Sequence, residues 1–245
     1  MAKHRLKKSA FRLILPPAIA VLAVFLFIYF ARRVSNLDYF KIKDIMVNGR
    51  DSADLAYLKG QNIFRIDIRR ESGYLGELYP DFKSIRLIKV FPNRLYVDFI
   101  KRKPLAMVKL YRYFCVDSES VLFDCPAEVT ERDFPVITGL DTKIFGPKTG
   151  TRYNLKELTL ALNIIQEASR QRTLKNFQMK RVSVLNPDNV TFFIERTEVK
   201  IGGGNLKERM AILGTLLNQS EKGLEGIEYI DLRFKEPVIK LKHAE

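Results

Sequence analysis

The sequence predicts an α+β protein with a single N-terminal transmembrane helix, and three observations lead to that prediction. An uncharged apolar run, 13–31, is bracketed by Arg12 and by Arg32-Arg33. After it, segments that alternate apolar and polar residues, typical of half-buried strands, mix with segments of helical periodicity. Turn signals such as Asn48-Gly49 separate these segments. Together they predict a small β-α-α-β-β domain followed by a mixed β-sheet domain with two main helices.

The apolar run 13–31 has the length and the flanks of a retained membrane anchor. Its nineteen residues make a helix of about 28 Å, close to the roughly 30 Å of bilayer hydrocarbon. A cleaved signal peptide is the alternative, but its apolar core is shorter and ends in small residues. Here the run ends in the bulky residues 25–30, followed by two arginines. We therefore expect an anchor that is not removed.

The positive charges on the two flanks of this run do not by themselves decide which end is cytoplasmic. The tail, 1–12, carries five Lys and Arg residues and no acid, which places it in the cytoplasm by the positive-inside rule. The other flank, 32–50, also carries five, so simple counting gives a tie. Long domains translocate largely regardless of charge, which favours a cytoplasmic tail and an extracytoplasmic bulk.

Two domains are predicted in the extramembrane part, with a boundary at Pro104. The first, 38–104, is expected to contain strand 40–47, helices 52–59 and 69–79, and strands 83–90 and 94–101. The second, 105–242, is expected to contain helices 153–170 and 206–219 and a series of short strands. These strands are predicted at 106–110, 111–116, 121–125, 178–185, 190–195, 197–201, 227–233 and 237–242. A short tail, 243–245, follows.

The composition favours an acidic partner and disfavours nucleic acid. The formal net charge is +14, which would attract anionic lipid headgroups, an anionic wall polymer or an acidic protein. The chain has no basic helix and no aromatic-basic signature of an RNA-binding sheet. Its two cysteines, Cys115 and Cys125, would pair only in an oxidising compartment. A hairpin centred on residues 117–120 places Cys115 opposite Leu122, which argues against that disulfide without excluding it.

No residue pattern indicates catalysis, a metal site or a cofactor. His4 and His243 lie near the chain ends, away from other potential ligands. Gly202-Gly203-Gly204 precedes a helix but lacks the spacing of a phosphate-binding loop, so we interpret it as a turn. Asp67, Asp231 and Glu236 are candidates for paired carboxylates, but acids at strand ends are more often solvated or paired with arginine. The sequence therefore predicts a binding or scaffold protein rather than an enzyme.

Taken together in order, a set of short motifs resembles the FtsQ/DivIB family of bacterial division proteins. In the first domain these motifs are Phe40-Lys-Ile-Lys-Asp-Ile, Val47-Asn48-Gly49, Asn62-Ile63-Phe64 with Asp67, Leu78-Tyr79-Pro80, Val90-Phe91-Pro92-Asn93-Arg94-Leu95 and Lys101-Arg102-Lys103-Pro104 with Ala106. In the second they are Cys115-Val116-Asp117, Pro135-Val136-Ile137-Thr138-Gly139, Ile201-Gly202 and Tyr229-Ile230-Asp231-Leu232-Arg233-Phe234. The resemblance implies a POTRA-like domain over 38–104 and an FtsQ-type β domain over 105–242.

The resemblance also implies a function. It predicts a non-enzymatic, membrane-anchored scaffold of the divisome, located in the inner membrane at the septum. Such a scaffold would bind single-pass division proteins of the FtsB/FtsL type and help to control septal peptidoglycan synthesis. Two alternatives stay open: a POTRA-bearing transport or assembly subunit, and an anchored protein that binds anionic wall polymer.

A C-terminal sheet edge is the predicted partner-binding site, because an edge strand offers unpaired backbone groups to an added strand. The predicted site residues are Phe234, Val238, Ile239, Lys240, Leu241 and Lys242. The two lysines suit an acidic partner segment. Pro237, which cannot donate to a ladder, puts the length of this last strand in question. A second interface is expected in the POTRA-like domain, through strand 94–101 or helix 69–79.

Overall fold

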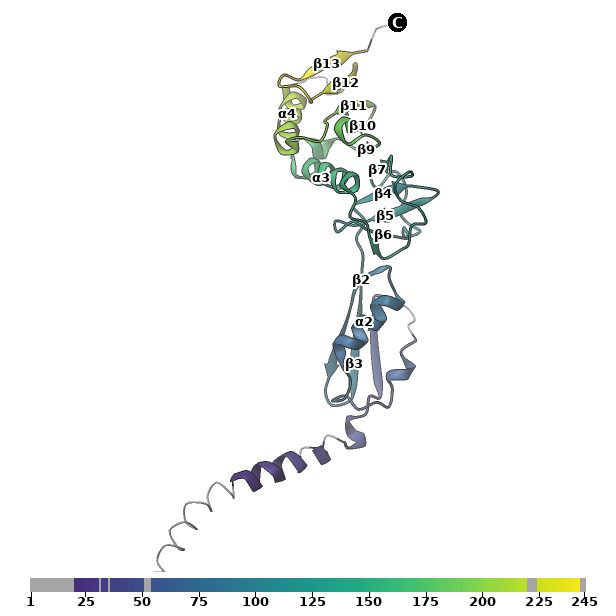
Figure 1. The fold of residues 1–245 in the computed structure, drawn as a ribbon, viewed down its shortest axis with the longest axis vertical. Coiled ribbons are helices and arrows are strands. Elements are labelled where there is room, and N and C mark those ends of the chain that lie inside the picture. Colours follow the sequence, from purple (N-terminus) through teal and green to yellow (C-terminus); the bar gives the residue numbers. More distant parts are fainter. Residues whose placement is uncertain (1–19, 31, 35, 51–53, 220–223, 243–245) are drawn as a thin grey trace, which may run out of the picture. The chain divides into compact units, whose positions relative to one another are not determined.

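A computed structural model describes the chain except for residues 1–19, 31, 35, 51–53, 220–223 and 243–245 (Figure 1). The described chain forms two compact units. Unit 1 comprises the residues up to Leu78 together with Ser84–Ile100, and unit 2 comprises Tyr79–Lys83 and the residues from Lys101 onward. Each unit has its own sheet and its own buried core.

The predicted transmembrane helix over 13–31 is corrected by the structure. Within the described part of the chain, no helix is both long enough and apolar enough to span a bilayer. Residues 20–30 and 32–34 are helical. The beginning of the predicted span, 13–19, and its last residue, Ala31, lie outside the described residues, as does the predicted cytoplasmic tail.

Unit 1 packs one long helix against a three-stranded sheet. Its elements are η1 (Asp38–Phe40), β1 (Asp44–Asn48), η2 (Ala56–Leu58), α2 (Ile68–Leu78), β2 (Phe82–Val90) and β3 (Arg94–Lys101). The strand order is β1-β3-β2, and β1 runs parallel to β3. Alternate residues of β3, Leu95, Val97 and Phe99, are buried, which is the period of a strand with one face on the core.

Local chemistry explains where the elements of unit 1 begin and end. The Asp67 carboxylate accepts the backbone N–H groups of Arg69 and Arg70 and so caps the first turn of α2. Gly49 ends β1 with φ +83°, and a Cβ there would lie 2.1 Å from the carbonyl oxygen of Phe99. The predicted helix 52–59 is wrong in kind, because its described residues form only the single 3-10 turn η2.

Unit 2 is built on one ten-stranded sheet. Its strands are β4 (Ala106–Lys109), β5 (Tyr113–Val116), β6 (Val121–Phe123), β7 (Val136–Thr138), β8 (Thr151–Arg152), β9 (Met179–Ser183), β10 (Thr191–Ile194), β11 (Thr197–Lys200), β12 (Ile227–Asp231) and β13 (Val238–Leu241). Their order is β13-β12-β11-β10-β9-β7-β4-β5-β6-β8. The pairs β4·β7, β7·β9 and β11·β12 are parallel.

Helices cover one face of this sheet. The helices are α3 (Lys156–Arg170) and α4 (Leu206–Gln219), and both pack on the same side (Figure 1). The core between helices and sheet includes fully buried Phe114, Phe192 and Leu158. Burying a side chain of this size stabilises the fold by about 1.5–3 kcal/mol relative to leaving it in water. The predicted bounds of α4, 206–219, are confirmed.

The opposite face of the sheet is partly covered by the segment between β6 and β7. A small apolar cluster lies there, formed by Met107, Cys115, Phe123 and Val136. Cys115 and Cys125 form a disulfide in it, with their Cα atoms 5.0 Å apart. The predicted hairpin register was wrong by one residue, because Cys115 pairs with Phe123 and not with Leu122. Cys125 is therefore two residues beyond the partner of Cys115, on the same side of the ladder.

Candidate partner-binding edge

The last strand, β13, forms one edge of the ten-stranded sheet (Figure 1). It pairs antiparallel with β12, with Ile239 opposite Ile230 and Val238 opposite Asp231. Pro237 immediately precedes the strand, which extends over Val238–Leu241 where 237–242 was predicted. Among the described residues, no strand pairs with the outer side of β13.

The direction of each backbone group on β13 follows from one hydrogen bond. The N–H of Lys242 donates to the carbonyl oxygen of Gly226, so it faces β12. Backbone direction alternates along an antiparallel strand, which also turns the N–H groups of Lys240 and Val238 toward β12. The N–H groups of Ile239 and Leu241 therefore face away from the sheet. The irregularity in this pair falls on β12, between Ile227 and Tyr229, and leaves the alternation on β13 intact.

The predicted site residues are exposed and mostly apolar. The exposed fractions are 61% for Phe234, 46% for Val238, 43% for Ile239 and 64% for Leu241. Lys240 and Lys242 lie on the same strand and at its end. The edge therefore offers both unpaired backbone groups and exposed apolar side chains. An added strand can form hydrogen bonds with the first and pack against the second.

Lys240 already has partners on β12. Its Nζ is 3.0 Å from a carboxylate oxygen of Glu228, and hydrogen bonding to that carboxylate raises the pKa of Lys240. Tyr229 lies between two cations, with Lys200 Nζ 4.0 Å and Lys240 Nζ 5.7 Å from its ring centroid. Tyr229 and Glu228 were not predicted as site residues, because only the β12–β13 register brings them beside Lys240.

The turn before β13 is held by a bidentate ion pair. Arg233 Nη2 lies 2.6 Å and Nε 2.9 Å from the two carboxylate oxygens of Asp231, and the N–H of Arg233 donates to the same carboxylate. Hydrogen bonding to Arg233 lowers the pKa of Asp231, against the effect of its burial. The guanidinium also donates to Asn189. This network fixes the chain just before exposed Phe234.

The other sequence candidates occupy structural positions. Asp67 caps α2 in unit 1, whereas Asp231 is paired with Arg233 in unit 2, so these carboxylates do not form a pair. The glycine turn at 202–204 encloses Arg209, whose guanidinium donates to the carbonyls of Ile201 and Arg233. Within the described residues, no group of three or more His, Cys, Asp and Glu side chains could hold a metal ion.

Strand 94–101, proposed above as a second interface, cannot accept a partner strand. It is β3, the central strand of unit 1, and pairs with β1 on one side and β2 on the other. Its backbone groups are therefore already used. Helix α2 is the remaining candidate of that prediction, with Tyr74 and Leu78 about half exposed.

The sequence is similar to known cell division proteins. The model of the family described as "Cell division protein FtsQ/DivIB, C-terminal" matches residues 106–233, slightly more than half of the chain. A protein named "Cell division protein FtsQ" from Geotalea daltonii is 23% identical over 86% of this chain and 79% of its own length. One of the same name from Syntrophotalea carbinolica is 25% identical over 82% and 74%, respectively.

Proposed function

The chain belongs to the FtsQ/DivIB family of cell division proteins, and we propose that it acts in that process as a non-enzymatic scaffold. In this proposal it joins other division proteins at the septum and helps to control septal peptidoglycan synthesis. Unit 2 provides the main docking site, the outer edge of β13. A partner segment of the FtsB/FtsL type adds to that edge as a further strand.

The observation that carries the proposal is the outward direction of the N–H groups of Ile239 and Leu241. Each hydrogen bond to an added strand contributes about 0.5–1.5 kcal/mol net. Exposed Phe234, Val238 and Leu241 supply apolar area beside these groups. Backbone bonds thus give affinity, and alternate side chains give specificity.

The charges near the edge favour a partner segment with acidic residues. Lys240 is on β13 and Lys242 follows directly after it, and Lys200 of β11 lies beside Tyr229 of β12. Opposite charges in neighbouring strands stabilise a pair by about 0.2–1 kcal/mol, and like charges destabilise it. An acidic segment would therefore be selected over a basic one.

Unit 1 serves in this proposal as a POTRA-like domain that contributes a second interface. Its order of one strand, one long helix and two strands, with the edge strand β1 parallel to the central strand β3, supports that interpretation. Docking through α2 would use its exposed face and leave the sheet unchanged.

A pull-down with the full chain tests the edge. We expect Ile239→Pro to lose the division partners that the wild type captures from membranes of the source cell, because proline removes an outward donor. Phe234→Ala should weaken the same capture. Arg152→Pro on β8 is the matched control. The Tyr153 N–H faces β6 by bonding to Ser120, so the Arg152 N–H faces away from that strand.

The outcomes separate the possible sites. Loss in Ile239→Pro with retention in Arg152→Pro, both variants being folded by circular dichroism, supports the β13 edge. Retention of the same partners in Ile239→Pro and Phe234→Ala contradicts it and makes α2 of unit 1 the next candidate. Measurable hydrolase activity that depends on one carboxylate would contradict the scaffold itself.

A further inference from the structure

Unit 2 has a groove that the proposed edge does not use. It encloses about 840 Å³ and opens on the face of the sheet opposite the helices α3 and α4. Strand residues from β4, β7, β9 and β10 form its floor, and residues 130–132 form one wall. Its volume lies within the range of about 300–1,000 Å³ that is typical of ligand sites.

Cations outnumber acids in the groove. Lys109, Arg132, Lys180 and Arg181 line it, and none of them forms an ion pair with another described residue. The acids are Glu131 and Glu195. Glu131 is engaged by the hydroxyl of Tyr113, and this hydrogen bond raises the pKa of Tyr113. With four cations against two acids, the groove therefore has an excess of positive charge, and no ion pair neutralises its cations among the described residues.

Between these cations the floor includes apolar side chains. Phe193 on β10 is directly opposite Arg181 on β9, and the guanidinium carbon lies 4.4 Å from the ring centroid. Val136 on β7 pairs with Arg181 from the other side. Thr138 and Gln178 add hydrogen-bonding groups. Cations thus surround a floor that can accept an apolar side chain.

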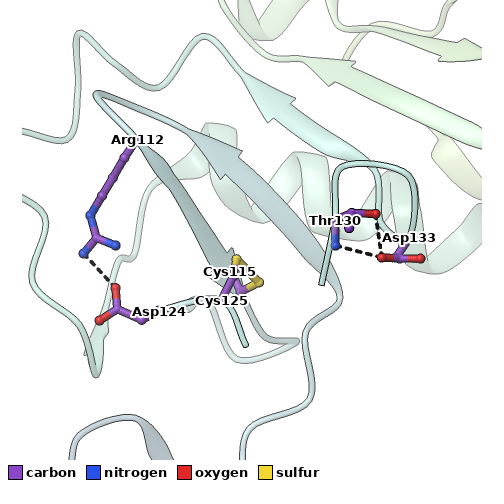
Figure 2. Close-up of a disulfide and its surroundings, with 6 residues drawn as sticks. All are labelled: Arg112, Cys115, Asp124, Cys125, Thr130 and Asp133. Atoms are coloured by element: carbon purple, nitrogen blue, oxygen red, sulfur yellow. Dashed lines mark hydrogen bonds and ion pairs between the residues drawn. A yellow bond between two sulfur atoms is a disulfide. The ribbon is translucent and has the colours of Figure 1, made fainter. Parts of the chain in front are cut away.

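The wall of the groove is held in place by local bonds. Figure 2 shows the Cys115–Cys125 disulfide at the start of the 126–135 segment and the Thr130–Asp133 turn within it. The backbone N–H and the hydroxyl of Thr130 lie 2.7 Å and 2.8 Å from one Asp133 oxygen. Gln178 donates to the carbonyl of Arg132, which joins the wall to the residue before β9. Such a fixed wall lowers the ordering cost of binding.

We propose that this groove binds an acidic peptide segment of a partner protein, with an apolar residue seated on Phe193 and Val136 and carboxylates facing Lys109, Lys180 and Arg181. A peptide supplies both parts, whereas a uniformly charged polymer has nothing to place on the apolar floor. The charge complementarity is that of acidic-motif recognition by basic clusters. The site is separate from the β13 edge, since β10 is three strands away in the sheet, about 14 Å at the usual spacing.

Fluorescence anisotropy with the full chain tests this site. The probe is a labelled short peptide of alternating glutamate and leucine, and the competitor is polygalacturonate, an anionic polysaccharide without apolar side chains. We expect the double variant Lys180→Glu, Arg181→Glu to weaken peptide binding about tenfold or more, and Lys109→Glu on the other side of the groove to weaken it as well. Lys207→Glu on α4, on the helix-covered side of unit 2, is the matched control.

Each outcome decides for or against the proposal. Peptide binding that weakens with salt and in the groove variants, but is unchanged in Lys207→Glu and in Ile239→Pro, supports it. Equal binding of polygalacturonate that is weakened to the same extent in the double variant Lys180→Glu, Arg181→Glu overturns it in favour of a general polyanion surface. Absence of peptide binding, or binding insensitive to all three groove cations, overturns it as well. Loss of capture in Ile239→Pro reports on the edge alone, so the two proposals fail independently.

Discussion

The two edges of the ten-stranded sheet differ in a way that separates a protected edge from an available one. At one end, β8 has only two residues, Thr151 and Arg152. At the other end, β13 has four, and its apolar side chains are exposed. Very short edge strands and charged edge residues are common means of preventing unwanted strand addition. The β8 edge is both very short and charged, whereas the β13 edge carries a charged residue but is longer.

Ion pairs and backbone hydrogen bonds at each edge reinforce this difference. Arg152 of β8 reaches Glu119 at 3.4 Å, and the N–H of Tyr153 just beyond the strand bonds back to Ser120. On β8 only the N–H of Arg152 faces outward, whereas on β13 the N–H groups of both Ile239 and Leu241 do. The contrast supports the proposal that a partner covers the β13 edge, because an uncovered edge of this kind is an aggregation hazard.

A buried carboxylate stabilises the turn nearest each edge. Asp117, 4% exposed, accepts the N–H groups of Glu119 and Val121 and lies 2.7 Å from Arg102. Asp231, also 4% exposed, is paired with Arg233. The pairs differ in the burial of the cation, since the side chain of Arg102 is 10% exposed and that of Arg233 is 33% exposed.

The largest predicted effect comes from the more buried pair. Asp117→Ala should lower the free energy of unfolding by about 3–5 kcal/mol, because it leaves Arg102 buried without its carboxylate and two backbone N–H groups without an acceptor. Asp231→Ala should cost less, about 1–3 kcal/mol, since Arg233 can be hydrated. Urea denaturation measures both, and equal losses would remove this distinction between the two turns.

A smaller effect is expected from removing the disulfide. Replacing Cys115 and Cys125 together by alanine should cost about 2–4 kcal/mol, because the bond restricts the unfolded chain. The same change should loosen the 126–135 wall of the groove and weaken binding of the acidic peptide there. Capture of partners at β13 should be unchanged. Comparison of oxidised wild type with the double variant in urea and in the pull-down checks this, and loss of β13 capture would count against separate sites.

The smallest effect is a pH dependence at the β13 turn. The native pKa of Asp231 is below its ordinary value of 3.8, since hydrogen bonds from Arg233 favour the carboxylate. The unfolded state thus takes up the proton first, so this stabilisation is present above pH 3.8 and is lost as the pH falls through the native pKa. Wild type should exceed Asp231→Asn by about 1–2 kcal/mol at neutral pH and by less at pH 3. A difference that stays constant with pH would contradict the assignment.

Local sequence patterns predicted most helices and strands, but they did not predict the order of the strands in the sheet. Strand β3 and helix α4 have the predicted bounds, 94–101 and 206–219, because their periodicity is strong and turn residues flank both. Strand β7 was missed as a strand, since only Val136, Ile137 and Thr138 lie between Pro135 and Gly139. Its place between β4 and β9 is a tertiary property that no short window contains.

The candidate sites show the same limit. The residues of β13 were predicted because they are consecutive and the resemblance marked the C-terminal edge. The groove draws on separate strands and on residues 130–132, and its cations come from three places that are far apart in sequence: Lys109, Arg132 and Lys180-Arg181. The disulfide was disfavoured because the predicted hairpin register was wrong by one residue. A shift of one residue moves a side chain to the other face of the ladder, so Cys125 was expected on the face opposite to Cys115. The membrane-spanning helix was predicted from the length of the apolar run and from its basic flanks, and the described residues do not form one.

Residue-resolved amide hydrogen exchange of the full chain, with and without a purified FtsB/FtsL-type partner, tests strand addition at β13 most directly. Val238 and Lys240 face β12 and should be protected in both samples. Ile239 and Leu241 should exchange quickly alone and become protected with the partner, because their N–H groups then donate to the added strand. Unchanged exchange at Ile239 and Leu241, with new protection confined to α2 or to the groove, would contradict the account.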